Sequence, residues 1–484
     1  MMNASFLAYG AMAIGAAAIT WTSLYNLGTA GALFLFLNPI VNIEVAFGDT
    51  RRSISYDKLA LLALALGFAW HVLRNSKHAR PKSQPIFCYI WLACIAWSLV
   101  AAWLSGAPPE QQFWGLAETI AYFITFLVFQ AICADDLSRN RMLKAILYGG
   151  FIMLAAVLFQ NLAYQLSWKI WGPRYAFRAD LLYSPFTRTF FDSRPGPIGH
   201  PNFLAAYLVL WAALYPYLFR MFSRPAALAI IAMHLIVLAL TGSYGGVFGF
   251  GVCCSVVLFF TKPIPTNMTS GRISRTGGRL LRHFLAAFLI LAIGAVAAND
   301  EDFLDLSLFP RIYIYRVGGK MLADRPLTGH GNGLFPQAFQ KSEREYIDNE
   351  GLSTPPWRVT HDEPERAGKS RDREEERTNA AANYLPPLSA HSSYLKAFVE
   401  TGFPGGILFL CLIVGGLIEV FAHLRKTMRL SIRSPEAWGW AACIGVCFQA
   451  GAENIFSSPK ISVLFWAVTA YCLTAKPSHS ENPE

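Results

Sequence analysis

Two kinds of side chain in this sequence could carry polar chemistry: a histidine at the start of an apolar run, and arginines in two polar segments. His391 lies in AHSSYLKAFVETGFPGG (390–406), directly before a long apolar stretch. Histidine titrates near neutral pH and suits proton transfer, whereas arginine makes forked hydrogen bonds to phosphate or carboxylate. The arginines are Arg174, Arg178, Arg188, Arg194, Arg311, Arg316 and Arg325. Each alone fits contact with lipid headgroups, but convergence on one cavity would indicate an anionic, lipid-borne substrate.

The elements that must position these residues are membrane helices. The 484 residues are 54% hydrophobic and 15% charged, with mean hydropathy +0.35, whereas soluble domains carry about 25% charged residues. The apolar blocks are long enough to cross about 30 Å of hydrocarbon, which takes roughly 20 helical residues. They lie near 57–73, 86–104, 113–133, 143–166, 203–219, 226–241, 245–261, 284–298, 403–422, 437–452 and 461–475. The sequence predicts an all-α, polytopic helical membrane protein.

The N-terminal apolar segment, 5–42, is interrupted at SLYNLGTAG. It has no basic start and no clean small-residue cleavage site, so we interpret it as a retained membrane anchor. With the first residue on the cytoplasmic side, the basic loop at 71–82 favours one long or broken pass here over two. The expected total is therefore about 12 spans, with 13 as the alternative count.

Basic residues give the expected orientation. The loops at 71–82, 137–144, 271–283 and 423–433 are almost purely basic and alternate as cytoplasmic loops do, so the net charge of +10 indicates topology and not nucleic-acid binding. The nine cysteines fall in or beside apolar blocks, and Cys443 and Cys447 share a helix face without a histidine or acidic partner. We therefore expect no metal site.

This orientation divides the chain into three parts. Residues 1–299 form membrane helices with an outward loop near 167–201, residues 300–395 form one large outward loop, and residues 396–484 form the C-terminal membrane helices and a short tail. The middle of the large loop mixes both signs of charge with proline and glycine, which is typical of a solvated segment. Its two ends have patterns suited to short amphipathic helices.

Three stretches resemble the O-antigen ligase and O-antigen polymerase superfamily. In HSSYLKAFVETGFPG, His391 and Ser392 are followed by nine residues and then by Gly402 and Gly405, which is the spacing of the ligase group. RIYIYRVGGKMLADRPLTGHGNGLF (311–335) resembles the family's arginine, aromatic residue and PLtGxGxGxF pattern. RPGPIGHPNFLAAYL (194–208) resembles its third motif through Arg194, Gly196, Asn202 and Ala205. The resemblance extends over roughly 150–460.

The resemblance implies a membrane glycosyltransferase in a bacterial inner membrane, with its active site facing the periplasm. The donor would be a glycan on undecaprenyl diphosphate, and the acceptor a sugar hydroxyl on lipid A core or on a growing glycan. The leaving diphosphate already carries negative charge, so cationic hydrogen-bond donors are needed more than a metal or another cofactor. His391 would be the catalytic base and Arg311 the catalytic cation.

The remaining candidates are substrate-binding residues: Arg194, Arg316, Arg188, Asn202, His330 and Tyr244. Asn202 also suits a helix cap, and His330 and His200 lie among Gly and Pro residues that are typical of tight turns. Glu400 follows His391 by nine residues and need not face it. Many relatives have Ser-Arg-Gly where this chain has Ser243, Tyr244 and Gly245, and Tyr315 stands where tryptophan is commoner.

The acceptor remains open at this stage. The histidine spacing favours an O-antigen ligase. A polymerase of O-antigen or exopolysaccharide and a protein O-oligosaccharyltransferase would use the same donor. A transporter is a separate class, and it should show polar residues deep within its spans or broken spans repeated in two halves; here the polar residues concentrate in outward loops.

Overall fold

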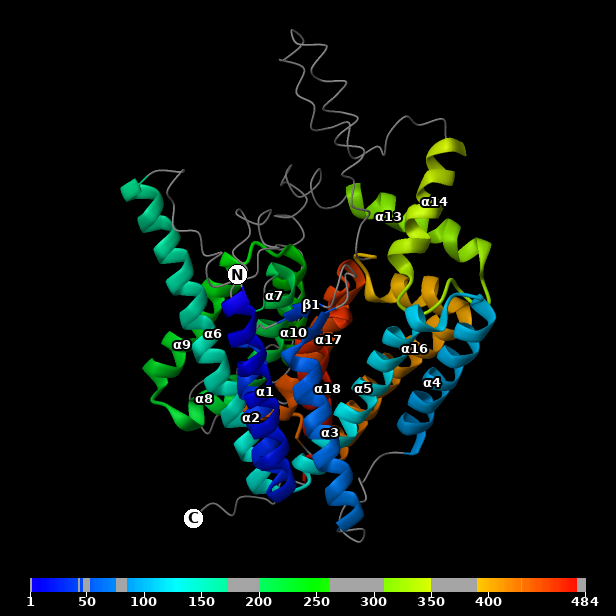
Figure 1. The fold of residues 1–484 in the computed structure, drawn as a ribbon. Helices are drawn as coiled ribbons and strands as arrows, with labels where there is room; N and C mark the ends of the chain where they lie inside the picture. The colour runs from blue at the N-terminus through cyan, green and yellow to red at the C-terminus, as the bar shows by residue number, and fades with distance from the viewer. Residues whose placement is uncertain are drawn as a thin grey trace, which may run out of the picture.

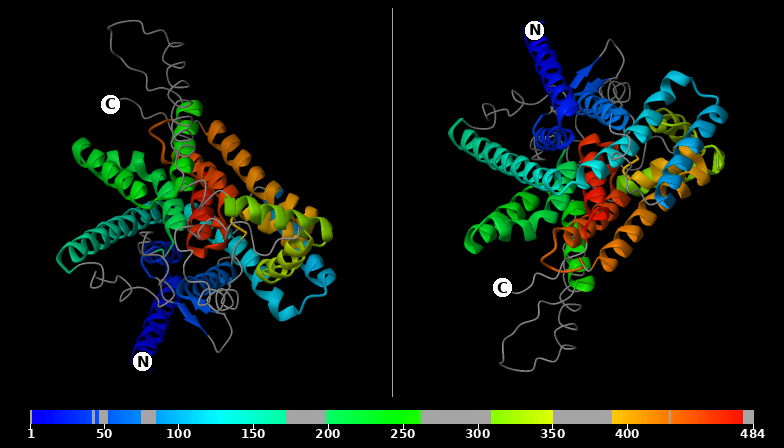
Figure 2. Two further views of the ribbon diagram at one scale, coloured as in Figure 1. Left: turned by 90° about the horizontal axis from the view of Figure 1, so that it is seen from above. Right: turned by 90° about the horizontal axis from the view of Figure 1, so that it is seen from below.

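Helices pack in three groups around a central pair, α17 and α18 (Figures 1 and 2). The structure, a computed structural model, describes residues 2–41, 44–46, 53–74, 85–171, 198, 200–261, 309–349, 390–427 and 429–476. The central pair is α17 (Pro435–Ala452) and α18 (Pro459–Leu473), joined through the 3-10 helix η8 (Ile455–Ser457). α18 is buried along nearly its whole length, as expected for an apolar helix at the centre of the bundle.

The surrounding groups do not all follow chain order, because the third combines helices from two separate parts of the chain. The first comprises α1 (Met2–Tyr25), α2 (Leu27–Leu37), the antiparallel strands β1 (Glu44–Ala46) and β2 (Ser53–Ser55), and α3 (Tyr56–Arg74). The second comprises α6 (Asp136–Trp171), α7 (Pro201–Trp211), the 3-10 helix η4 (Ala212–Leu214), α8 (Tyr215–Met221), α9 (Arg224–Leu240) and α10 (Tyr244–Phe260). The third comprises α4 (Pro85–Ser105), α5 (Pro109–Cys133) and α16 (Ser393–Lys426), with α13 (Phe309–Asp324) and α14 (Phe335–Asn349) over one end (Figure 1).

Six of the described helical segments are long and apolar enough to cross a membrane, so the predicted helical membrane character is confirmed. They are Tyr56–Arg74, Phe87–Ser105, Gly115–Cys133, Asp136–Gln160, Pro201–Met221 and Ser393–Lys426. Four shorter apolar helices accompany them: α2, α9, α10 and α18. The span predicted at 284–298 lies outside the described residues, and the total of 12 spans stays a prediction.

The N-terminal segment breaks where the sequence indicates, but its second half returns across the bundle. Asn26 caps α2 by accepting a hydrogen bond from the Thr29 amide (2.9 Å), and Arg141 at the start of α6 donates to Thr29. Eleven residues of helix later, Asn38 donates to the Lys460 carbonyl at the start of α18 (3.0 Å). Since α18 ends where α6 begins, α2 runs from the start of α6 toward the start of α18, whereas α1 runs in the opposite direction (Figure 1). α2 is therefore antiparallel to α1, and the expectation of one broken pass is wrong.

Two of the predicted cytoplasmic loops, 137–144 and 423–433, lie at the same end of the bundle, whereas 271–283 and most of 71–82 lie outside the described residues. Lys476 after α18 pairs with Asp136 at the start of α6 (2.5 Å). Arg220 at the end of α8 donates to the Arg433 carbonyl (3.2 Å), and Arg429 donates to the Lys476 carbonyl (3.0 Å). The opposite end holds α13, α14 and the start of α16 (Figure 1).

Local signals in the sequence start several helices at that opposite end. The side chains of His200 and Ser392 accept hydrogen bonds from backbone amides in the first turns of α7 and α16. Pro201 and Pro459 occupy the first turns of α7 and α18, where the missing N–H has no helical partner to lose. Helix starts are therefore fixed within one turn of the residues discussed below.

The loop 326–335 is strapped onto a break in α16. The His330 and Gly331 amides donate to the Val399 and Glu400 carbonyls (both 2.9 Å), and the Phe403 amide donates to the Pro326 carbonyl (2.7 Å). The Glu400 carboxylate also accepts from the Phe335 amide (3.2 Å). The two sequence motifs, 311–335 and 391–405, thus form one structural unit, and Glu400 serves this junction.

Gly402 makes the junction possible. Its φ of 72° and ψ of −178° lie in a region that only glycine populates readily. A Cβ atom there would come within 2.3 Å of the Leu327 carbonyl oxygen. The glycine therefore satisfies both a conformational and a steric requirement.

We expect Gly402→Ala to destabilise the protein by at least about 1–3 kcal/mol from backbone strain alone, with the collision against residue 327 added. Thermal unfolding of the detergent-solubilised protein measures the loss. Gly319→Ala on α13 is the matched control, because no heavy atom lies within 4 Å of its added Cβ. Equal melting temperatures for the two variants would contradict the role given to Gly402.

Candidate active site

One carboxylate joins the two residues that the sequence marks as catalytic. Glu453 Oε1 pairs with the Arg311 guanidinium, and Oε2 lies 3.5 Å from His391 Nδ1. The Glu453 side chain is only 5% exposed, whereas that of His391 is 38% exposed. The imidazole therefore has a buried acidic partner beside Nδ1 and an accessible surface.

Glu453 is held at the end of α17. Its amide donates to the Gln449 carbonyl (3.0 Å), and its backbone is extended where the helix stops. Ser393 of α16 donates to the Glu453 carbonyl (3.4 Å) and accepts from the Phe456 amide (3.1 Å). Burial acts to raise the pKa of Glu453, but the hydrogen bond from His391 and the charge of Arg311 outweigh it and lower the pKa. The carboxylate is therefore ionised at neutral pH.

His391 has an unusual backbone. Its φ is +45°, and it is the non-glycine residue with a positive φ among those that the structure describes. Such backbone strain persists where surrounding contacts enforce it. The next residue, Ser392, accepts from the Leu395 amide (3.2 Å) and starts α16. The Tyr315 hydroxyl lies 3.3 Å from the His391 carbonyl. These contacts direct the imidazole toward Glu453.

Arg311 and Tyr315 stand one turn apart on α13. Their spacing of four puts both on one helix face, which explains the arginine-and-aromatic pattern in the sequence. The Tyr315 hydroxyl donates to the Gly451 carbonyl (2.8 Å), two residues before Glu453. α13 thus reaches the end of α17 through an ion pair and a hydrogen bond.

His200 brings a third element to the same place. Its Nδ1 accepts from the Asn202 amide (3.2 Å) and caps α7, so the cap is His200 and not Asn202. Burial lowers the pKa of His200; the nearby charge of Glu453 opposes this effect, and His391 and Arg311 add to it. His200 is therefore neutral at pH 7, as its capping role requires.

The other predicted substrate-binding residues are spread more widely. Arg316 is exposed on α13, about 140° around the helix from Arg311. His330 Nε2 lies 2.9 Å from the Met321 carbonyl within the strapped loop. Tyr244 begins α10. Arg188 and Arg194 lie outside the described residues.

Asn202 keeps a connection to the site through its backbone. Its carbonyl accepts from Gln449 Nε2 (2.8 Å), one turn before Glu453 on α17. α7 is thereby tied to the element that carries the acid. A direct role for the Asn202 side chain stays a prediction.

The sequence interpretation missed Glu453. Its signal was available: QAGAENIFSSP (449–459) is a short polar interruption between two apolar helices, at the end of the bundle opposite the basic loops. What no local pattern reveals is that residue 453 meets residues 311 and 391, because those contacts span 142 and 62 positions. Among the described residues, no group of three His, Cys, Asp or Glu side chains could hold a metal ion.

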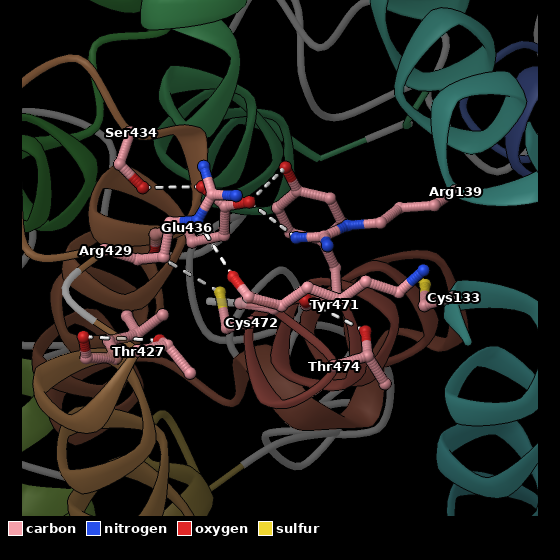
Figure 3. Close-up of polar contacts among 12 residues, drawn as sticks. Cys133, Arg139, Thr427, Arg429, Ser434, Glu436, Tyr471, Cys472 and Thr474 are labelled. Atoms are coloured by element: carbon pink, nitrogen blue, oxygen red, sulfur yellow. Dashed lines mark hydrogen bonds and ion pairs between the residues drawn. The ribbon is translucent and has the colours of Figure 1, made fainter. Parts of the chain in front are cut away.

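A second buried polar cluster lies at the basic end of the bundle (Figure 3). Glu436 Oε1 pairs with Arg139 (2.5 Å) and accepts from the Tyr471 hydroxyl (3.2 Å), while Oε2 accepts from Ser434 (2.5 Å). The Arg139 guanidinium also stacks on the Tyr471 ring, 4.3 Å from its centroid. Glu436 is thus fully engaged, so the cluster ties α6, α17 and α18 together.

We expect Glu436→Ala to cost about 3–5 kcal/mol of stability, because it leaves the buried Arg139 charge unpaired. Asp136→Asn is the matched control: it breaks the exposed pair with Lys476, which is worth less than about 1 kcal/mol. Thermal unfolding in detergent compares the two. A Glu436 variant as stable as the Asp136 variant would show that the cluster does not hold the bundle together.

No protein-family model matches the chain, and no curated protein matches it.

Proposed function

We propose that this protein is a membrane glycosyltransferase that moves a glycan from undecaprenyl diphosphate to an acceptor hydroxyl. The observation that carries the proposal is the Glu453 carboxylate with His391 on one oxygen and Arg311 on the other. These two residues come from separate motifs of the O-antigen ligase and polymerase resemblance. A base and a phosphate-binding cation are the two groups that such a transfer requires.

In the proposed reaction the acceptor oxygen attacks the anomeric carbon of the donor sugar. The bond from that carbon to the diphosphate oxygen breaks, and the diphosphate leaves with the bonding electrons. His391 Nε2 takes the hydroxyl proton, and Glu453 stabilises the imidazolium that forms. Arg311 offers positive charge where negative charge grows on the diphosphate.

Arg311 is shared between Glu453 and this proposed role. A guanidinium has five N–H donors, and in the proposed complex a phosphate oxygen would accept from this group while Glu453 stays beside it. Its pairing also holds the side chain in one orientation before the donor arrives, which lowers the cost of reorganisation. Arg188 and Arg194 remain proposed as further donors to the diphosphate.

The proposed location is a bacterial inner membrane, with the active site on the periplasmic face and about 12 spans in all. The support is the separation of charge: the basic loops 137–144 and 423–433 lie at one end of the bundle, and Glu453, His391 and Arg311 lie at the other. Basic loops favour the cytoplasmic side, so the candidate site faces away from it. Lipid A core is the acceptor favoured by the histidine spacing.

The test incubates purified protein with undecaprenyl-diphosphate glycan and competing acceptors. One discrete glycolipid product supports a ligase, a ladder on the donor lipid indicates a polymerase, and a glycoprotein indicates a protein O-oligosaccharyltransferase. Transfer to none of these, together with movement of labelled donor across vesicles without a new glycosidic bond, would overturn the proposal in favour of a transporter.

A further inference from the structure

A cavity lies beside the candidate active site, between α4, α5, α16 and α18. Its volume is about 140 Å³, on a measure by which one water needs only about 10–15 Å³. The residues that matter for its chemistry are Trp91, Glu118, Lys396, Glu400, Asn454 and Trp466. The space therefore admits a small organic group, and its wall combines aromatic rings with charged groups.

The cavity and the active site share a wall. Ser393 and Asn454 both line the cavity, and Ser393 Oγ also contacts the Glu453 carbonyl and Asn454 Oδ1 (both 3.4 Å). Glu453 is in turn the partner of His391. A group bound in the cavity would thus lie beside Ser393 and Asn454, and Ser393 contacts Glu453, the partner of the proposed base.

Three polar groups on the wall are available to a bound molecule. Within the described part of the chain, the Lys396 ammonium and the Glu118 carboxylate make no hydrogen bond and no ion pair within 4.0 Å. Trp91 is 2% exposed, and its indole N–H is buried without a hydrogen-bond partner among those residues. A buried donor left in this state costs free energy, and a hydrogen-bond acceptor bound in the cavity would remove that cost.

The charges indicate which chemistry fits. The wall carries one basic group, Lys396, and two acidic groups, Glu118 and Glu400, of which Glu400 accepts from the Phe335 amide. The cavity therefore has no excess of positive charge. This balance disfavours a phosphate or another strong anion. A neutral ring with many hydroxyl groups suits it, because hydroxyls both donate and accept while the ring's apolar face packs on the Trp91 and Trp466 rings.

We propose that this cavity binds one neutral sugar ring. Its assignment to the acceptor rests on the proposed function: a glycan with one ring held there would extend past Ser393 and Asn454, so that a hydroxyl of another of its sugars reaches His391. Binding of a sugar by the cavity does not depend on that assignment.

The test measures binding in the absence of donor, by saturation-transfer NMR on the full chain in detergent. The probes are methyl glucoside, methyl galactoside and methyl N-acetylglucosaminide. We expect saturable binding of at least one, weakened about tenfold by Lys396→Met and by Glu118→Gln, since a hydrogen bond to a charged group is worth about that factor. Trp91→Phe, which keeps a ring and removes the N–H, should weaken binding several-fold.

Two controls locate the binding. Lys320→Met on α13 and Trp103→Phe, an 81% exposed residue of α4, lie outside the cavity lining and should leave binding unchanged. Absence of saturable binding for all three sugars, or equal binding by cavity and control variants, would overturn the proposal.

A transfer assay separates this inference from the proposed function. If both hold, Lys396→Met raises the acceptor KM about tenfold and changes the donor KM by less than a factor of two to three. If sugar binding is lost in the cavity variants but the wild type transfers no glycan, the cavity is a sugar site and its acceptor assignment is wrong.

Discussion

His391→Ala is expected to lower glycan transfer by about 10²–10⁴-fold, the usual contribution of a positioned general base, while the protein still inserts and accumulates. The physical reason is that a sugar hydroxyl is a weak nucleophile and Nε2 would be the group that removes its proton. Product formation by purified variant and wild type measures the effect. His423→Ala is the control, because His423 contacts the Ala475 carbonyl (2.8 Å) at the basic end of the bundle.

A double variant tests whether His391 and Glu453 act as a unit. Glu453→Gln alone should reduce transfer by on the order of 10²-fold or more, since the imidazole loses the anion that orients and stabilises it. Combined with His391→Ala it should cause no further loss, because residues that act together are non-additive. Losses that multiply in the double variant would show that Glu453 does not act through His391.

Arg311→Ala is expected to lower transfer by about 10²–10³-fold, as removal of one preorganised donor to a developing anion does. The change also leaves the buried Glu453 carboxylate without its cation, which destabilises the protein. Thermal unfolding is therefore measured beside activity. Arg311→Lys keeps the charge but loses the fork, so it should retain part of the activity.

The combination Arg311→Ala with Glu453→Gln separates a structural role from a binding role. The neutral amide removes the unpaired charge, so much of the lost stability should return. If Arg311 serves only to hold Glu453, the double variant will be as active as Glu453→Gln alone. We expect it to be markedly less active, with the extra loss reporting the contact of Arg311 with the diphosphate.

Hydropathy predicted these helices well because every helix that crosses the hydrocarbon needs about 20 predominantly apolar residues. The apolar blocks at 57–73, 86–104 and 113–133 match α3, α4 and α5 within a few residues. The prediction for the segment 5–42 was wrong because the direction of a helix across the bundle depends on the residues that its two ends contact. Thr29 meets Arg141 and Asn38 meets Lys460, and neither contact leaves a local pattern.

The residues of the candidate site likewise divide into those that the sequence could predict and those that it could not. His391 and Arg311 were accessible to sequence reasoning because they stand in motifs with fixed spacing, and Tyr315 follows from Arg311 by helical geometry. Glu453 was not, since a single acid after an apolar helix is an ordinary helix end until its long-range partners are known. The positive φ of His391 could not be predicted from the sequence either, because glycine is the residue type that indicates such a backbone conformation.

The strap between the loop 326–335 and α16 has a consequence for how the site works. Arg311, on α13, and His391, at the start of α16, are both attached to that junction, whereas Glu453 extends from α17. The acid and its two partners are therefore carried by different helices, so a displacement of α17 relative to α13 and α16 would change the contacts of Glu453 with both partners together.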